Sequence, residues 1–295
     1  MDLTSLKVIK NLLERYDSRP FKGWGQNFLI DKQVLKKIID AANLKKSDIV
    51  LEIGPGIGTL THELAKRAKK VISVEKDKKM VEILKETLKD FDNVEVVRGD
   101  ILKSNIQNLI SNTSYKIVAN LPYYVVAPVI RKFLECNEVE CNEARPRYMP
   151  RYMILMVQKE VAQRICSKPP DMNLLAVSVQ FYVHPHTKFG VGARPEILFY
   201  VSKNSFWPRP KVDGAVIKII PRESAFKIRV NPLLFFKIVK AGFSHPRKQL
   251  CNNLANGLKL NKAQVRNWLL KNGVQPSQRA ETLKIKDWLN LTMTY

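Results

Sequence analysis

Long hydrophobic segments are absent from this chain of 295 residues, because no uninterrupted apolar run reaches the length that spans a bilayer. The N-terminus also lacks the apolar core and small-residue cleavage site of a secretory signal. Cysteine is scarce: there are four, none in a C-x-x-C pair, and the four histidines do not stand at zinc-ligand spacing around them. We therefore expect a cytoplasmic protein with reduced cysteines, no bound metal and no membrane association.

Acidic residues are few for the number of basic ones. The chain has 50 Lys and Arg against 27 Asp and Glu, and the resulting net charge of +23 is spread along its length. This excess is larger than solubility requires, and it predicts a polyanionic partner such as nucleic acid. An anionic membrane surface is the rival partner, but charge alone supports it.

Segments of strand length alternate with segments of helical periodicity over residues 1–221. This pattern predicts an α/β fold with a doubly wound, mostly parallel sheet. Strands are expected at residues 49–53, 71–74, 94–97, 115–119, 153–157 and 215–219, and helices at about 3–16, 59–69, 77–90, 126–135 and 159–166, with another helix beginning near Asp31. The length and apolar content allow one such large domain and a smaller one.

The smaller domain is expected at residues 222–295. This segment has 14 Lys and Arg against 3 Asp and Glu, a net charge of +11. Helical patterns occur near 232–243, 247–257, 262–271 and 284–290. We predict a basic helical domain.

A glycine-rich segment, Glu52–Gly58, follows the strand at 49–53 and leads into a helix. Its glycines allow the backbone to approach a ligand where the strand ends form a crevice. The dinucleotide pattern G-x-G-x-x-G is not met, because the third glycine falls at 58 and Thr59 stands in its place. The segment therefore favours a nucleoside ligand over a dinucleotide, with a tight strand-to-helix turn as the alternative.

Acidic side chains follow the next two strands. Glu75 lies 19 residues beyond Gly56, where a carboxylate can accept hydrogen bonds from both ribose hydroxyls. Asp100 can accept from an adenine amine while Ile101 packs on the ring. For either acid alone, a solvated strand end or a helix cap is the favoured interpretation. Together with the glycine segment they lie at one edge of one sheet.

The fourth strand ends in Asn120-Leu121-Pro122-Tyr123. If the Asn120 side-chain oxygen and the Leu121 carbonyl each accept one N–H of an adenine amine, the nitrogen is drawn towards tetrahedral geometry and its lone pair becomes available for in-line attack. Pro122 fixes the carbonyl, and Tyr123 can stack on the base. A capped and rigid strand-to-helix turn is the alternative interpretation of the tetrapeptide alone.

The ordered set Glu52–Gly58, Glu75, Gly99-Asp100 and Asn120–Tyr123 resembles the class I S-adenosylmethionine-dependent methyltransferases that act on adenine amines, whose Rossmann-like sheet has seven strands. Two further motifs narrow the resemblance: Gly25-Gln26-Asn27-Phe28-Leu29, and Phe206–Asp213 with the sequence FWPRPKVD. They are similar to motifs of the small-subunit ribosomal RNA adenine dimethyltransferases, the KsgA type. The resemblance extends from about Leu6 to the C-terminus.

The resemblance implies a cofactor, a substrate and a role for each motif. S-adenosylmethionine would be bound and S-adenosylhomocysteine released, without a metal. Asn27 and Leu29 would close over its methionine end, Gly54 and Gly56 would contact its backbone, Glu75 its ribose, and Asp100 its adenine, on which Ile101 would pack. The other cofactor-binding residues would be Gln26, Lys76 and Asn120. The target base would be held by Asn120, Leu121, Pro122 and Tyr123, with Phe206 on its opposite face.

The family places two methyl groups on each of two adjacent adenosines near the 3′ end of small-subunit ribosomal RNA, during maturation of the subunit. The implied partner is therefore an immature small subunit, bound by a monomer whose residues 222–295 contact RNA. The chain departs from the family at Pro246, where a basic residue is usual, and in longer loops at 136–152 and 184–197. A tandem duplication within residues 136–153 has no assigned role.

Two alternatives stay open. One is a large-subunit ribosomal RNA adenine methyltransferase of the macrolide-resistance type, although Leu121 and Lys211-Val212-Asp213 favour the small-subunit enzyme. The other is a nucleic-acid-binding assembly or transcription factor that keeps the fold without catalysis.

Overall fold

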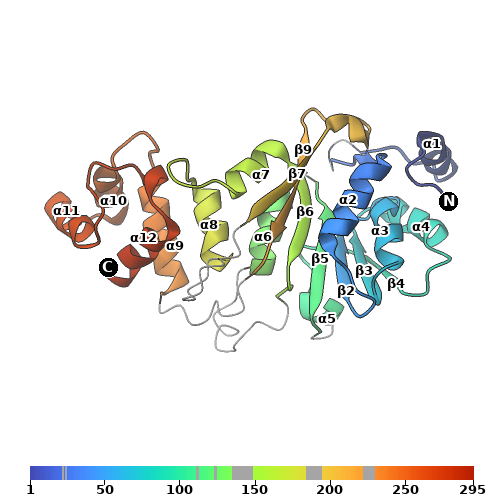
Figure 1. Ribbon diagram of the computed structural model, residues 1–295, viewed down its shortest axis with the longest axis horizontal. Coiled ribbons are helices and arrows are strands. Elements are labelled where there is room, and N and C mark those ends of the chain that lie inside the picture. Colours follow the sequence, from blue (N-terminus) through green and yellow to red (C-terminus); the bar gives the residue numbers. More distant parts are fainter. Residues whose placement is uncertain are drawn as a thin grey trace. The chain divides into compact units, whose positions relative to one another are not determined.

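The computed structural model describes residues 1–21, 23, 25–110, 113–122, 125–134, 149–183, 195–221 and 230–295 (Figure 1). These residues form two compact units. The first comprises the described residues of Met1–Cys136, Pro146–Ala162 and Glu196–Pro221, and the second those of Gln163–Pro195 and Arg222–Tyr295. Most of the loops singled out at 136–152 and 184–197 lies outside the described residues.

The first unit is built on a sheet of seven strands in the order β4-β3-β2-β5-β6-β9-β7 (Figure 1). The strands are β2 (Ile49–Ile53), β3 (Lys70–Glu75), β4 (Val94–Arg98), β5 (Tyr115–Asn120), β6 (Met153–Gln158), β7 (Glu196–Val201) and β9 (Gly214–Ile219). The first five pair in parallel, and β9 pairs antiparallel with both β6 and β7. The predicted doubly wound, mostly parallel sheet is confirmed.

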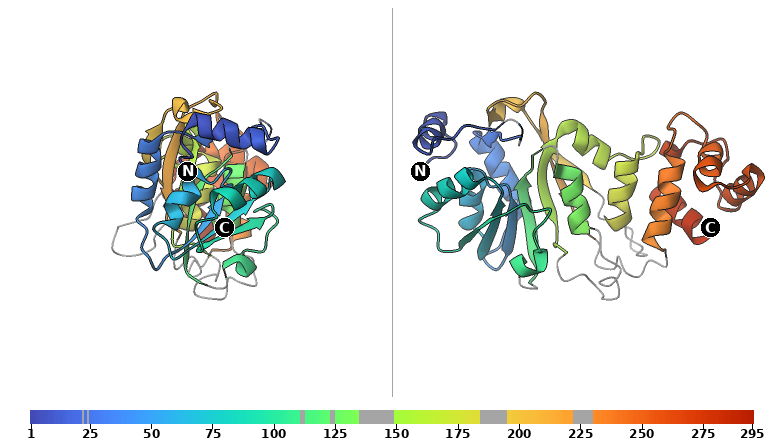
Figure 2. Two further views of the ribbon diagram at one scale, coloured as in Figure 1. Left: turned by 90° about the vertical axis from the view of Figure 1, so that its right-hand side faces the viewer. Right: turned by 180° about the vertical axis from the view of Figure 1, so that it is seen from behind.

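Helices lie on both faces of this sheet (Figure 2). They are α2 (Lys32–Ala42), α3 (Thr59–Ala65), α4 (Lys78–Thr87), α5 (Ile106–Ile110), α6 (Val126–Leu134) and the start of α7 (Lys159–Ile165). Apolar residues of α2 and α3, among them Ile38 and Leu64, pack on Val50 and Val118 of the sheet in one buried cluster. Side chains alternate between the two faces along each strand, so a run that is buried throughout, such as Ile117, Val118 and Ala119 of β5, is covered on both faces.

The N-terminal helix α1 (Leu6–Arg15) packs through Ile9, Leu12 and Leu13 on Met80 and Ile83 of α4. This helix is amphipathic, as its spacing of apolar residues predicted. No helix among the described residues is long and apolar enough to cross a membrane.

The second unit consists of helices. They are α8 (Leu174–Val183), α9 (Pro232–Gly242), α10 (Leu250–Leu258), α11 (Lys262–Lys271) and α12 (Ile285–Met293). The four segments predicted near 232–243, 247–257, 262–271 and 284–290 are therefore confirmed as helices. Their packing is close: a Cβ on Gly257 would stand 2.6 Å from the Cβ of Ala241, so α10 approaches α9 along a residue without a side chain.

The second unit includes more of the chain than residues 222–295. Residues 163–183 belong with the C-terminal helices, because Phe181 of α8 stacks on Phe235 of α9 with ring centroids 4.2 Å apart. The sequence pattern did not predict α8. The helix, with the sequence LLAVSVQFYV, is apolar nearly all round, so it has no polar stripe that would reveal helical periodicity.

A buried ion pair lies where β5 begins, at the edge of the sheet opposite to the carboxyl ends of the parallel strands. Lys116 Nζ lies 2.6 Å from Asp48 Oδ2, and the two side chains are only 7% and 8% exposed. Lys116 also donates to the Asn43 carbonyl at 3.1 Å, which ties the end of α2 to the sheet. Burial raises the pKa of Asp48, but its hydrogen bonds, above all that from Lys116, hold it below the usual value.

We expect Lys116→Met to lower the free energy of unfolding by about 3 to 5 kcal/mol at pH 7, because it leaves the Asp48 carboxylate buried without its partner. Adding Asp48→Asn to this variant should recover a large part of the loss, since no charge then remains buried. Denaturation in urea measures both. Equal stabilities of the single and double variants would show that the ion pair does not determine the effect.

Candidate functional site

The strand order reverses between β2 and β5, and this switch point creates the site. β3 and β4 continue the sheet on one side of β2, whereas β5 and β6 continue it on the other. The carboxyl ends of parallel strands meet at one edge, and ligands bind in the crevice at such a reversal. A cavity of about 310 Å³ lies there, lined by residues that end β2, β3 and β5 or directly follow β4.

Nearly all residues predicted from the sequence lie around this one cavity. Those that line it are Gln26, Asn27, Leu29, Gly54, Gly56, Glu75, Lys76, Asp100, Ile101, Asn120, Leu121, Pro122 and Phe206. Tyr123 lies outside the described residues. Their common location is a finding, whereas the role of each stays a prediction.

Glycines shape the turn after β2. Gly54 and Gly56 have φ angles of 69° and 58°, a left-handed conformation that favours glycine. A Cβ on Gly56 would also stand 3.3 Å from the ring of Phe28, which covers the turn. The backbone N–H of Gly56 donates to Glu75 Oε2 at 3.1 Å, so the turn and the end of β3 hold each other in place.

Glu75 is buried and fixed by backbone donors. Its Oε2 accepts from Gly56, and its Oε1 accepts from the N–H of Asp77 at 2.8 Å. Burial raises the pKa of Glu75 above its usual value. A carboxylate held in this way has lone pairs left for two further donors, as the vicinal hydroxyls of a ribose would supply.

Asp100 is held by a cation and by its own turn. Lys76 Nζ lies 3.0 Å from Oδ2, and the Leu102 N–H donates to Oδ1 at 3.0 Å. Burial raises the pKa of Asp100, but the hydrogen bond from Lys76 and that from Leu102 hold it below its usual value. The carboxylate is therefore ionised at neutral pH and can accept from an exocyclic amine.

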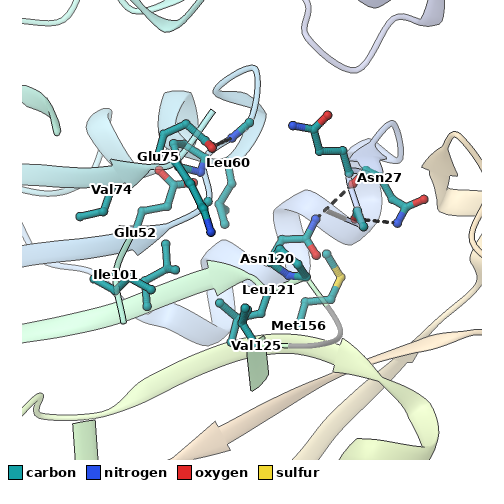
Figure 3. A pocket seen from close by; sticks show the side chains of 18 of the residues that line it. Asn27, Glu52, Leu60, Val74, Glu75, Ile101, Asn120, Leu121, Val125 and Met156 are labelled. Atoms are coloured by element: carbon teal, nitrogen blue, oxygen red, sulfur yellow. Dashed lines mark hydrogen bonds between the residues drawn. The ribbon is translucent and has the colours of Figure 1, made fainter. Parts of the chain in front are cut away.

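The orientation of Asn120 is set by the N-terminal segment. Its Nδ2 donates to the Asn27 carbonyl over 3.4 Å, and Figure 3 shows the two residues facing each other beside the cavity. Because the amide nitrogen is used in this way, the Asn120 side-chain oxygen is the atom left to act as an acceptor. Asn27 in turn donates its own Nδ2 to the Gly25 carbonyl at 2.9 Å.

Gln26 braces the same segment. Its Nε2 donates to Asp77 Oδ2 at 2.9 Å, and its Oε1 accepts from the Phe21 N–H at 2.8 Å. The glutamine thus ties the N-terminal segment to the turn after β3, next to Glu75.

Met156 and Glu52 are among the cavity residues that had no predicted role. Met156 lies within β6, opposite Asn120 in the strand register, so knowledge of which strands are neighbours would have identified it. Glu52 was noted only as the first residue of the glycine segment. It lines the cavity on the same side as Glu75 (Figure 3), and Ser73 donates to its Oε2 at 2.9 Å.

Glu52 is the most strongly perturbed carboxyl of the site. It is 1% exposed, and burial raises its pKa to about 7. Together with Glu75 and Asp100, it gives three carboxyl groups against one ammonium, that of Lys76, among the described residues that line the cavity. The balance favours a ligand with positive charge.

The chain is similar to a known protein family and to its members. Residues 20–295 match the family of ribosomal RNA adenine dimethylases. Ribosomal RNA small subunit methyltransferase A from Dehalococcoides mccartyi is 40% identical over 287 residues, which are 97% of this chain and 92% of that protein.

Two solved structures have the same fold. The crystal structure of a dimethyladenosine transferase from Plasmodium falciparum is similar with a TM-score of 0.68 at 28% identity, over 90% of this chain and 96% of that one. The 23S rRNA methyltransferase ErmE gives a TM-score of 0.68 at 24% identity, over 91% and 99%. At the latter identity the likeness shows the fold alone.

We expect the buried carboxyl of Glu52 to lower stability as pH rises. The unfolded chain releases this proton near pH 4.5 and the folded chain near pH 7, so the free energy of unfolding falls between these values. At pH 8, Glu52→Gln should therefore be more stable than the natural chain by up to about 3 kcal/mol, and near pH 4.5 the two should agree. Urea denaturation at both pH values tests this, with Glu95→Gln on the surface as control. A difference that is the same at both pH values would contradict it.

Proposed function

Since the chain belongs to the ribosomal RNA adenine dimethylase family, we propose that it transfers methyl groups from S-adenosylmethionine to the N6 amines of two adjacent adenosines near the 3′ end of small-subunit ribosomal RNA. The substrate is an immature small subunit, and the reaction accompanies its maturation. The orientation of Asn120 carries this proposal, because its side-chain oxygen is left to accept from an amine beside a cavity suited to a cationic nucleoside.

The cavity has the groups that S-adenosylmethionine requires. Glu75 can accept from both ribose hydroxyls, and Asp100 can accept from the adenine amine while Ile101 packs on the ring. Glu52 lies where a buried carboxylate would offset positive charge. The cofactor supplies an electrophilic methyl group on a sulfonium. Asn27 and Leu29 lie at the same cavity and are placed to cover the reactive end and exclude water.

The target amine is activated by acceptors, not by a strong base. Asn120 Oδ1 and the Leu121 carbonyl each accept a hydrogen bond from one N6–H. These hydrogen bonds would localise the nitrogen lone pair and direct it at the methyl group. Phe206, which is 5% exposed and lines the cavity, is proposed to pack against the flipped base. Tyr123 is proposed to stack on the opposite face.

The second unit supplies a surface for RNA. Over residues 230–295 there are eleven Lys and Arg, all exposed, against two acids. Both acids are engaged, Glu281 with Arg279 at 3.6 Å and Asp287 with the N–H of Lys284 at 2.8 Å. We propose that this surface binds the phosphates of the ribosomal RNA. We propose that the protein acts as a monomer in the cytoplasm.

The small-subunit substrate is favoured over the large-subunit one by the relatives. The 40% identical protein is named for the small subunit, whereas the likeness to the 23S enzyme extends to the fold only. Mapping the methylated bases in each subunit distinguishes the two substrates.

We expect Asn120→Ala to reduce the rate of methylation by about 100- to 1000-fold, because one acceptor for the amine is lost. Affinities for S-adenosylhomocysteine and for RNA should stay within a few-fold. Transfer of labelled methyl groups to immature small subunits measures the first, and calorimetry and fluorescence anisotropy the others. Asn108→Ala, on an exposed position of α5, is the matched control. Full methylation by Asn120→Ala would contradict this role of Asn120, whereas intact biological function of the variant without methylation would favour a non-catalytic factor.

We expect the double variant Arg247→Gln/Lys248→Gln to bind RNA with a weaker dependence on salt. Both residues are exposed, directly before α10. If each contacts one phosphate, the slope of log Kd against log salt concentration should fall by about 1.5 to 2. Lys85→Gln/Lys89→Gln on the first unit removes the same total charge. An equal decrease in both double variants would show that total charge, and not this surface, sets the affinity.

A further inference from the structure

A two-stranded ladder joins two segments that are far apart in the sequence. Strand β1 (Phe28–Leu29) pairs antiparallel with β8 (Phe206–Trp207), with Phe28 opposite Trp207 and Leu29 opposite Phe206. The Ile30 N–H extends the ladder by donating to the Ser205 carbonyl at 2.9 Å. We call residues 26–31 and 205–207 the clasp.

One side of the clasp touches the residues proposed to bind the methyl donor. Gln26 donates to Asp77 at 2.9 Å, and the Asp77 N–H donates to the Glu75 carboxylate at 2.8 Å. Phe28 lies over the glycine turn, where a Cβ on Gly56 would approach its ring to 3.3 Å.

The other side of the clasp bears Phe206, which lines the cavity near Asn120. The Asn27 carbonyl, on the first side, accepts from Asn120 Nδ2. The same short ladder therefore contacts donor-binding residues and both of the described side chains proposed to meet the target base.

A side-chain hydrogen bond locks the clasp directly before Phe206. Ser205 donates its hydroxyl to Asp31 Oδ2 at 2.9 Å, and Ser205 is 6% exposed. Asp31 Oδ1 accepts from the N–H groups of Gln33 and Val34 at 2.9 and 3.1 Å, so the same carboxylate caps α2. The serine is thereby anchored to the first turn of a helix that packs on the sheet.

We propose that Ser205, held by Asp31, is a positioning residue for the methyl acceptor: it fixes Phe206 against the target base and links that position to occupancy of the donor site. The proposal rests on the proposed function. A methyl donor bound under residues 26–29 would restrain β1. Because β1 pairs with β8, it would restrain β8 as well, and Phe206 would then be preorganised for the base. Binding of donor and of RNA should therefore reinforce each other.

The chain offers a matched control in the same loop. Ser202 caps the short helical turn Lys203–Ser205, where its hydroxyl accepts from the Asn204 N–H at 3.2 Å. Ser202 supports the local backbone, and in the described part of the chain no hydrogen bond joins it to Asp31. A role in local folding alone predicts that Ser202→Ala and Ser205→Ala behave alike.

The test compares Ser205→Ala, Ser205→Cys, Ser205→Thr and Ser202→Ala in the full-length protein. Methylation kinetics with immature small subunits give kcat and KM for each substrate. Fluorescence anisotropy gives the Kd of an RNA fragment containing the adenosines, with and without saturating S-adenosylhomocysteine. Thermal unfolding is measured for all variants.

We expect Ser205→Ala to raise KM for RNA by about tenfold, because a hydrogen bond to a charged group is lost, while the Kd of S-adenosylhomocysteine stays within about twofold. The gain in RNA affinity on adding S-adenosylhomocysteine should shrink towards none. Ser205→Cys, which keeps the volume and weakens the donor, should lie between Ser205→Ala and the natural chain. Ser205→Thr should restore the natural behaviour, and Ser202→Ala should keep it.

A natural chain without coupling between the two ligands would overturn the proposal, as would an unchanged KM and coupling in both Ser205→Ala and Ser205→Cys. Equal effects in Ser202→Ala would also overturn it. The proposed function fails separately, if the natural chain binds S-adenosylhomocysteine and RNA but transfers no methyl groups. The coupling is measured by binding, so it is tested in that case as well.

Discussion

The parallel pairing of β2 with β3 on one side and with β5 on the other is the constraint on which the site depends. It places the ends of four strands at one edge, although the residues concerned are spread from Gly54 to Asn120. Each end then contributes a different group: a glycine turn after β2, a carboxylate at the end of β3, a second carboxylate after β4 and an amide at the end of β5. The N-terminal segment completes the site, because Asn27 determines which atom of the Asn120 amide is available.

The site contains two buried carboxyl groups whose charged forms are disfavoured, and neighbouring hydrogen-bond donors offset part of this cost. Glu52 and Glu75 are both buried with a raised pKa, which means that the folded protein disfavours their charged forms. A cavity designed for stability alone would hold apolar residues in these places. The surrounding order offsets this: Ser73, Gly56 and Asp77 donate to the two carboxyl groups. Perturbed carboxyls of this kind cluster where a protein binds or reacts, and a cationic ligand would relieve the disfavoured charge.

Much of the fold could be predicted from the sequence, because buried parallel strands have continuous apolar runs and because their motifs stand at strand ends. The exceptions have physical reasons. The helix α8 is apolar nearly all round, and β7 is an edge strand whose pairing with β9 is irregular between Ile197 and Phe199. The site was predicted where a motif marks it. Contacts across long sequence separations were not, as with Ser205 and Asp31, which are 174 residues apart and have no pattern that joins them.

The second unit is assembled from two pieces of chain, with α8 in the first piece and α9 to α12 in the second. A chain that leaves the ribosome from its N-terminus presents α8 long before its partners α9 and α12 have been made. Until then the apolar surface that Phe181 and Val177 bury in the finished protein has nothing to pack against. The interval between the synthesis of α8 and that of α12 is thus a period in which exposed apolar surface on this helix favours aggregation.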